Sequence, residues 1–169
     1  DYGTVIRVTP GFSSVFGVGP AMGRVFESVD ETAGSAFTAI ISHDFWMRRF
    51  GGRPDAIGST ASFGERTFTI VGVMPPGFRF PTRTDLWYPA WVQPETTSRG
   101  AHNYRVVARL NDDVALTQAQ AEMTALAGRL EQAYPATNGE KGVVIVPLQE
   151  QLVGDTRPTL NLLAGAVGL

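Results

Sequence analysis

Alternating hydrophobic and polar residues predict several short β-strands along the chain. The pattern occurs in three segments that are rich in β-branched or aromatic residues, at 4–9, 36–42 and 85–90. Residues 60–73 predict a hairpin, because Gly64 and Glu65 fit the Gly-X pattern of a type II′ turn. Residues 103–110 and 142–148 predict two further strands.

Two short helices are predicted between these strands. For residues 10–16, Thr9 is expected as the N-cap, Pro10 at the first position and Gly17 after the last turn. For residues 43–50, Ser42 is expected as the N-cap, and two arginines in the last turn suit the helix dipole.

One long helix is predicted over residues 118–134. Thr117 and Gln120 have the spacing of a capping box, and Pro135 ends the pattern. Apolar residues follow at a spacing of three to four, at Ala119, Met123, Leu126, Ala127, Leu130 and Tyr134. With the flanking strands, this helix predicts a β–α–β unit from 103 to 148. Residues 91–102, rich in Pro, Thr and Ser, are the best candidate for a linker.

Residues 74–81, MPPGFRFP, predict a corner of the chain. Pro-Pro-Gly favours a tight turn, since proline presets φ and glycine tolerates a positive φ. Phe78 and Phe80 alternate around Arg79, so both rings are expected to face one way and cover the core of the β-rich region.

Composition and charge exclude several classes of protein. The 43% of apolar and 18% of charged residues are those of an ordinary globular chain. The net charge of −2, with scattered Lys and Arg, argues against nucleic-acid binding. The absence of cysteine excludes disulfides, thiolate metal sites and a cysteine nucleophile.

Candidate chemistry is sparse. His43 and Asp44 invite an acid–base interpretation, but a helix start with a partly solvated imidazole explains them more simply, and His102 lies in a polar segment. Asp112 and Asp113 fit a turn better than a calcium loop. No G-x-S-x-G elbow or P-loop is present. We therefore expect no catalytic residues, no cofactor site and no metal site.

Tryptophan and arginine positions suggest where a partner could bind. Trp46 and Trp87 are expected in the core, whereas Trp91 follows a predicted strand and is a candidate contact residue. Arg79, within the predicted corner, is the other candidate for contact with a partner.

Several ordered motifs together resemble a known family. RVTPGFSSVFGVGPAMGRVF, ISHDFWMRRFGG, FTIVGVMPPGFRFP and DLWYP are similar to the extracytoplasmic core domain of MacB-like ABC transporter permeases, of the FtsX-like class. The resemblance covers roughly residues 5–169. The closing LVGDTRPTLNLLAGAVGL is similar to the passage that enters the second transmembrane helix of those permeases.

The resemblance implies an α+β fold with two lobes. A porter-like α/β lobe is expected from residues 1–30 and 101–155, without the family's first strand and helix. A mostly β lobe is expected from residues 31–100, inserted between them. Residues 156–169 are expected to begin a transmembrane helix, helical from Pro158 onward.

The resemblance also implies a function without covalent chemistry. The domain is expected on the periplasmic side of the inner membrane, where it would transmit ATPase-driven motion and contact substrate or partner proteins. Its expected partners are an ATPase subunit and the permease's transmembrane helices, with an extracytoplasmic adaptor or substrate protein as a further candidate. The alternative that the residues leave open is a free-standing extracytoplasmic hydrolase or ligand-binding domain.

Overall fold

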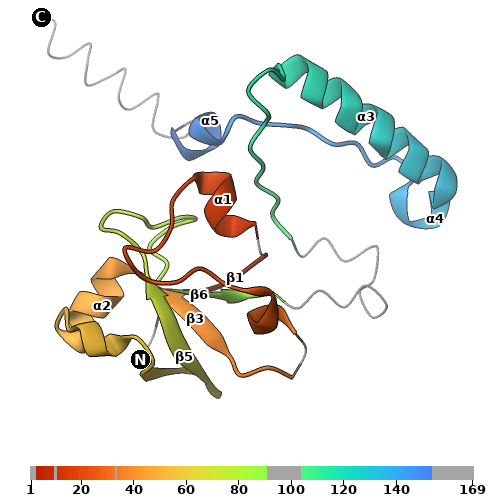
Figure 1. Cartoon of the computed structure of the whole chain (residues 1–169). Helices are drawn as coiled ribbons and strands as arrows, with labels where there is room; N and C mark the ends of the chain where they lie inside the picture. The colour runs from red at the N-terminus through yellow and green to blue at the C-terminus, as the bar shows by residue number, and fades with distance from the viewer. Residues whose placement is uncertain (1–2, 10, 33, 91–103, 154–169) are drawn as a thin grey trace, which may run out of the picture. The chain divides into compact units, whose positions relative to one another are not determined.

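The chain forms two compact units, Asp1–Thr97 and Ser98–Leu169, in a computed structural model (Figure 1). The structure describes residues 3–9, 11–32, 34–90 and 104–153. The division between the units falls within the predicted linker, 91–102. Trp91, His102 and the helix predicted over 158–169 lie outside the described residues.

The first unit is built on one six-stranded sheet. Its strands are β1 (Val5–Val8), β2 (Met22–Gly23), β3 (Thr38–Ile41), β4 (Thr60–Phe63), β5 (Arg66–Val73) and β6 (Leu86–Pro89). The order is β1-β6-β3-β5-β2, with β4 also paired to β5. The strands predicted in this part of the chain are therefore confirmed, as is the mixed α+β class.

The sheet mixes parallel and antiparallel pairs. β1 runs parallel to β6 and β3 parallel to β5, whereas β3 and β6 are antiparallel. β4 and β5 form the predicted hairpin, and Gly64 takes φ 60 at its turn. A parallel pair needs a crossover connection, which in most proteins contains a helix.

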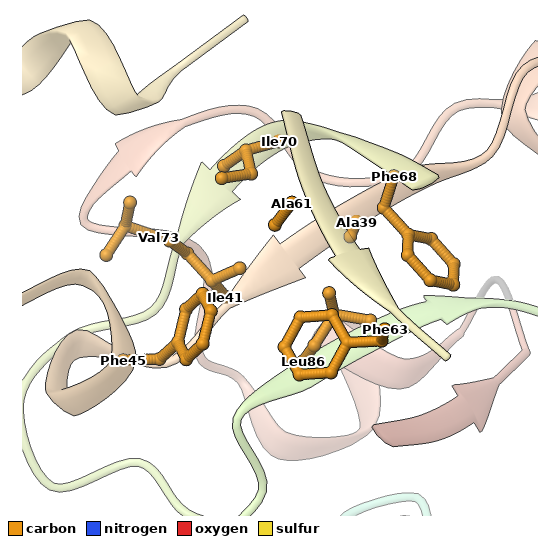
Figure 2. Close-up of a cluster of buried hydrophobic side chains, with 9 residues drawn as sticks. All are labelled: Ala39, Ile41, Phe45, Ala61, Phe63, Phe68, Ile70, Val73 and Leu86. Carbon is orange, nitrogen blue, oxygen red and sulfur yellow. The ribbon is translucent and has the colours of Figure 1, made fainter. Parts of the chain in front are cut away.

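Both faces of the sheet are buried. Neighbouring residues of a strand point to opposite sides, so Ile41 belongs to one core cluster and Ile40 to the other. Figure 2 shows the first cluster, which Phe45 joins from a helix: Ala39, Ile41, Phe45, Ala61, Phe63, Phe68, Ile70, Val73 and Leu86. The second consists of Val8, Ile40, Val71, Met74 and Trp87.

Two α-helices and two short 3-10 helices accompany the sheet. These are α1 (Phe12–Phe16), η1 (Ser28–Glu31), α2 (His43–Phe50) and η2 (Pro54–Ala56). Ser42 caps α2 as predicted, since its hydroxyl accepts a hydrogen bond from the Phe45 amide at 3.1 Å. The predicted Thr9 cap of α1 is wrong: the N-cap is Gly11, because only the carbonyl of Thr9 reaches the helix start, at Phe12.

The corner predicted at residues 74–81 is confirmed. Met74 is fully buried at the end of β5, and Gly77 has φ 83 in the turn that follows. The Phe80 ring lies 4.6 Å from that of Phe16, and Phe78 packs on both Phe16 and Trp87. The corner therefore places two aromatic rings against α1 and the second core cluster.

The second unit contains helices but no strand within the residues that the structure describes. α3 (Leu116–Ala133), α4 (Pro135–Asn138) and α5 (Leu148–Val153) follow one another. The long helix is confirmed, but its predicted capping box is wrong. Thr117 lies inside the helix, and the Gln120 side chain bonds instead to the backbone of Val143, at 2.7 Å, and of Ile145, at 2.8 Å.

The strands predicted at 103–110 and 142–148 are also wrong. Residues 104–110 and 142–147 carry no regular structure, and residue 148 begins α5. A strand needs a neighbouring backbone to bond its amides and carbonyls. In the described part of this unit neither segment has one, and Val106 and Val144 remain 88% and 81% exposed. The predicted β–α–β unit therefore does not form.

The predicted two-lobe division remains a prediction. The sheet of the first unit crosses the boundary expected at residue 30, because β1 pairs with β6 and β2 pairs with β5. Among the described helices, none combines the length and the apolar character needed to cross a membrane.

Candidate functional site

A polar cavity of about 610 Å³ opens in the first unit. Three parts of the chain line it: the residues before β1, helix α2 with its N-cap, and the connection between β5 and β6. The lining residues are Gly3, Thr4, Ser42, Asp44, Arg48, Arg79, Arg83, Thr84 and Asp85.

Asp85 holds these three parts together. Its carboxylate accepts a hydrogen bond from the Thr4 amide at 3.1 Å and pairs with Arg48 of α2 at 2.6 Å. Its backbone carbonyl accepts from the Ser42 amide at 2.9 Å, immediately before α2. Because Asp85 immediately precedes β6, these contacts fix the wall of the cavity to the sheet.

A second ion pair joins two residues of the cavity lining, Arg79 and Asp44. The Arg79 guanidinium lies 2.7 Å from the carboxylate of Asp44, and both side chains are about half exposed, at 55% and 43%. Asp44 occupies the first turn of α2, where an acidic residue also complements the helix dipole. The pair therefore ties the predicted corner to the helix.

Arg83 differs from the other two arginines of the cavity. It is exposed, and within the residues that the structure describes it has no carboxylate partner. Its backbone has φ 32, which is unusual for a residue other than glycine. Three arginines and two aspartates are among the described residues that line the cavity, and together these five side chains carry one net positive charge.

The arrangement does not assemble an acid–base pair from His43 and Asp44. Asp44 is paired with Arg79, and the His43 ring packs against the edge of Trp46, 5.4 Å between centroids. The Ser42 hydroxyl is buried and serves as the helix cap. In the part of the chain that the structure describes, no group of three His, Cys, Asp or Glu side chains could hold a metal ion.

The structure describes three of the four residues predicted as partner contacts or as core tryptophans. Arg79 lies on the rim of the cavity, whereas Trp91 is outside the described residues. Trp87 is fully buried and its indole donates to the Phe80 carbonyl at 2.9 Å. Trp46, on α2, is partly buried and packs against the first core cluster.

Sequence reasoning missed Arg48, Arg83 and Asp85 as parts of one site. Arg48 was explained by the helix dipole alone, although its guanidinium reaches Asp85, 37 residues away. The pairing of β1 with β6 brings Thr4 and Asp85 together. No local motif encodes that pairing, so only the sheet topology reveals the site.

The chain belongs to the family of MacB-like periplasmic core domains, whose family model matches residues 1–126. It is thus an extracytoplasmic domain of the class found in MacB-like ABC transporter permeases, as the sequence motifs predicted. No curated protein matched the sequence.

Two solved structures are similar to this chain. The periplasmic region of MacB from Actinobacillus actinomycetemcomitans aligns with a TM-score of 0.53 and 18% identity, covering 79% of this chain and 58% of that one. A domain of a putative permease protein from Porphyromonas gingivalis aligns with a TM-score of 0.48 and 20% identity, covering 75% and 59%. The first likeness supports the α+β fold, and this chain spans under two thirds of either structure.

Proposed function

We propose that this domain works as a non-catalytic part of an ABC-type permease, transmitting ATPase-driven motion outside the membrane and contacting substrate or partner proteins. The single observation that carries the proposal is the family match over residues 1–126. Asp44 pairs with Arg79, and the Ser42 hydroxyl caps α2. These contacts also support a role without covalent chemistry.

In this proposal the intact protein lies in the inner membrane, with this domain on the periplasmic side. Its partners are an ATPase and the permease's transmembrane helices, and an extracytoplasmic adaptor or a substrate protein is a further candidate. Arg79 is a proposed contact residue because it lines the polar cavity and its side chain is 55% exposed. Trp91 is proposed on sequence grounds alone.

The division into two compact units suggests how motion could be measured. In an intact, cysteine-free permease assembled with its ATPase, one spin label would be placed at Glu65→Cys, in the β4–β5 turn. The other would be placed at Ala121→Cys on α3. Because this chain has no cysteine of its own, the labels attach only to the introduced residues within it.

We expect the distance distribution between these labels to differ between the nucleotide-free and ATP-bound permease. A matched control pair, Met47→Cys with Glu65→Cys, lies entirely within the first unit and should give one distribution in both states. Identical distributions for the first pair in both states, in a permease that still hydrolyses ATP, would contradict the proposed transmission of motion.

A further inference from the structure

We propose that the polar cavity of the first unit binds a carboxylate group, with Arg83 as its principal anchor and Arg79 and Arg48 beside it. All three arginines line one cavity of about 610 Å³. Arginine presents a planar set of donors that matches the two oxygens of a carboxylate. The proposal is independent of the transport role, because it depends only on these side chains.

The distribution of partners identifies Arg83 as the anchor. Arg48 is held by Asp85 at 2.6 Å and Arg79 by Asp44 at 2.7 Å. Among the described residues, Arg83 alone of the three cavity arginines has no such carboxylate. An incoming anion would supply the missing charge for Arg83 and share donors of the two neighbouring guanidinium groups.

The two aspartates decide which anion fits. Among the described residues, the lining has three positive and two negative side chains, a net charge of +1. A single carboxylate neutralises that charge. A phosphate, with a charge of about −1.5 to −2 at neutral pH, would leave an excess of negative charge next to Asp44 and Asp85. The charge balance therefore favours a monocarboxylate, such as an acidic side chain or a chain terminus of a peptide.

The backbone around Arg83 is held in place for such a role. Arg83 has φ 32, and residues in sparsely populated regions persist only where their surroundings fix them. Thr84, next in the chain, is 2% exposed, and its hydroxyl lies within hydrogen-bonding distance of the carbonyls of Thr82, at 3.1 Å, and Phe80, at 3.4 Å. The loop thus fixes the position from which the Arg83 side chain extends.

The cavity lining argues against a mainly apolar ligand. Its nine described residues include five charged and three hydroxyl-bearing side chains, and the remaining one is Gly3. Pockets for drug-like ligands are lined mostly by hydrophobic and aromatic side chains. Here the recognition would be by charge and hydrogen bonds, which is suited to a small anionic group on a larger partner.

Propionate is a suitable probe, because it carries one carboxylate on a short aliphatic stem. The 15N-labelled chain of 169 residues would be titrated with propionate at constant ionic strength, with backbone amide and arginine Nε–H signals followed by NMR. We expect saturable shifts at Arg83, Arg79 and Thr84. Propionamide, the uncharged isostere, should produce none, and inorganic phosphate should bind more weakly than propionate.

Three variants test the assignment. Arg83→Gln should weaken propionate binding about tenfold or more, since a charged bidentate donor is lost. Arg83→Lys keeps the charge but loses the planar guanidinium, so its affinity for propionate should fall between those of wild type and Arg83→Gln. This variant also tests the assignment if Arg83→Gln does not fold. Arg53→Gln removes an arginine paired with Asp55 outside the cavity and should leave binding unchanged.

Several results would overturn the proposal. Shifts that do not saturate, equal shifts with propionamide, or unchanged affinity in either Arg83 variant would show that no carboxylate site exists here. Tighter binding of phosphate than of propionate would overturn the choice of ligand class. Loss of binding in Arg53→Gln would show that the overall charge of the chain, not the cavity, attracts the anion.

Discussion

The guanidinium of Arg24 donates two hydrogen bonds to the carboxylate of Asp30, at 2.6 and 3.1 Å. The same carboxylate accepts from the Glu27 amide at 2.7 Å, at the start of η1. The Asp30 side chain is 3% exposed, whereas that of Arg24 is 38% exposed. The hydrogen bond from Arg24 holds the pKa of Asp30 below its ordinary value, although burial opposes this shift.

Asp30 should therefore make stability depend on pH in the acid range. Its folded-state pKa lies below the unfolded value of about 3.9, so ionised Asp30 stabilises the fold above that pH. This contribution is lost as the pH falls through the folded pKa. At neutral pH, Asp30→Asn should lower the free energy of unfolding by about 1–3 kcal/mol, measured by urea denaturation.

The difference between wild type and Asp30→Asn should shrink as the pH is lowered below about 4. Asp55→Asn is the matched control, since Asp55 pairs with Arg53 at the surface and is 67% exposed. It should change stability by less than about 1 kcal/mol. A difference for Asp30→Asn that stays constant between neutral and strongly acidic pH would contradict this account.

Gly23 should tolerate no side chain. It lies opposite Gly72 in the β2–β5 pair, has φ 81, and an added Cβ would lie 2.2 Å from the Val71 carbonyl oxygen. Gly23→Ala should cost at least about 1–3 kcal/mol in the free energy of unfolding, from backbone strain and the collision. Gly19→Ala is the control, because nothing lies within 4 Å of its added Cβ.

Gly19→Ala should be neutral or slightly stabilising, because it restricts the unfolded chain. Thermal or urea unfolding of both variants provides the measurement. If Gly23→Ala unfolds at the same denaturant concentration as Gly19→Ala, then β2 is not fixed against β5 as described.

Most elements of the first unit could be predicted because their signals are local. Ser42 and Gly51 mark both ends of α2, and the Gly64-Glu65 turn marks the hairpin. The corner at Pro75–Gly77 follows from turn chemistry that needs no tertiary context. β2, with two residues, was missed because its pairing with β5 depends on close backbone approach and not on a sequence pattern.

The second unit shows where such reasoning fails. Residues 104–110 and 142–147 have the apolar, β-branched composition of strands. Composition gives a segment a tendency to be extended, but a strand forms only where another backbone pairs with it. The cavity was missed for a related reason. Arg48 is far in sequence from Arg83 and Asp85, and no sequence motif joins the three residues. Only the folded sheet brings them to one cavity.

Gln120 should stabilise the extended segment beside α3. Its amide bonds to both the carbonyl of Val143 and the N–H of Ile145, as a neighbouring strand would. Gln120→Ala should therefore speed hydrogen exchange at Ile145 by about five- to tenfold, as expected from losing about 1 kcal/mol of hydrogen bonding. Gln118→Ala, which removes a surface contact with Glu122, should leave that rate unchanged.

Equal exchange at Ile145 in the two glutamine variants would show that the Gln120 contact does not hold the segment. Circular dichroism of both variants would verify that α3 itself remains folded. Gln118 and Gln120 both lie in the first two turns of that helix, so a similar change in helix propensity is expected from either substitution.

The chain should not hydrolyse ATP or common ester, peptide and glycoside substrates. Asp44 is held by Arg79 and the Ser42 hydroxyl by the helix start, so His43 has no nucleophile that it could activate at this site. Turnover would be measured for wild type and His43→Ala. An activity of the wild-type chain that His43→Ala abolishes, with its circular dichroism spectrum retained, would contradict the proposal and favour the hydrolase alternative.

The first unit should fold without the second. Both of its core clusters, its whole sheet and the residues that line its cavity come from within residues 3–90. A fragment of residues 1–97 should therefore unfold cooperatively, with Trp87 buried, as monitored by fluorescence. The two-lobe division predicts otherwise for residues 1–30, which would depend on residues 101–155. If hydrogen exchange in β1 and β2 rises selectively in the fragment while β3 and β5 stay protected, the inserted-lobe arrangement is favoured and the independence of the first unit is refuted.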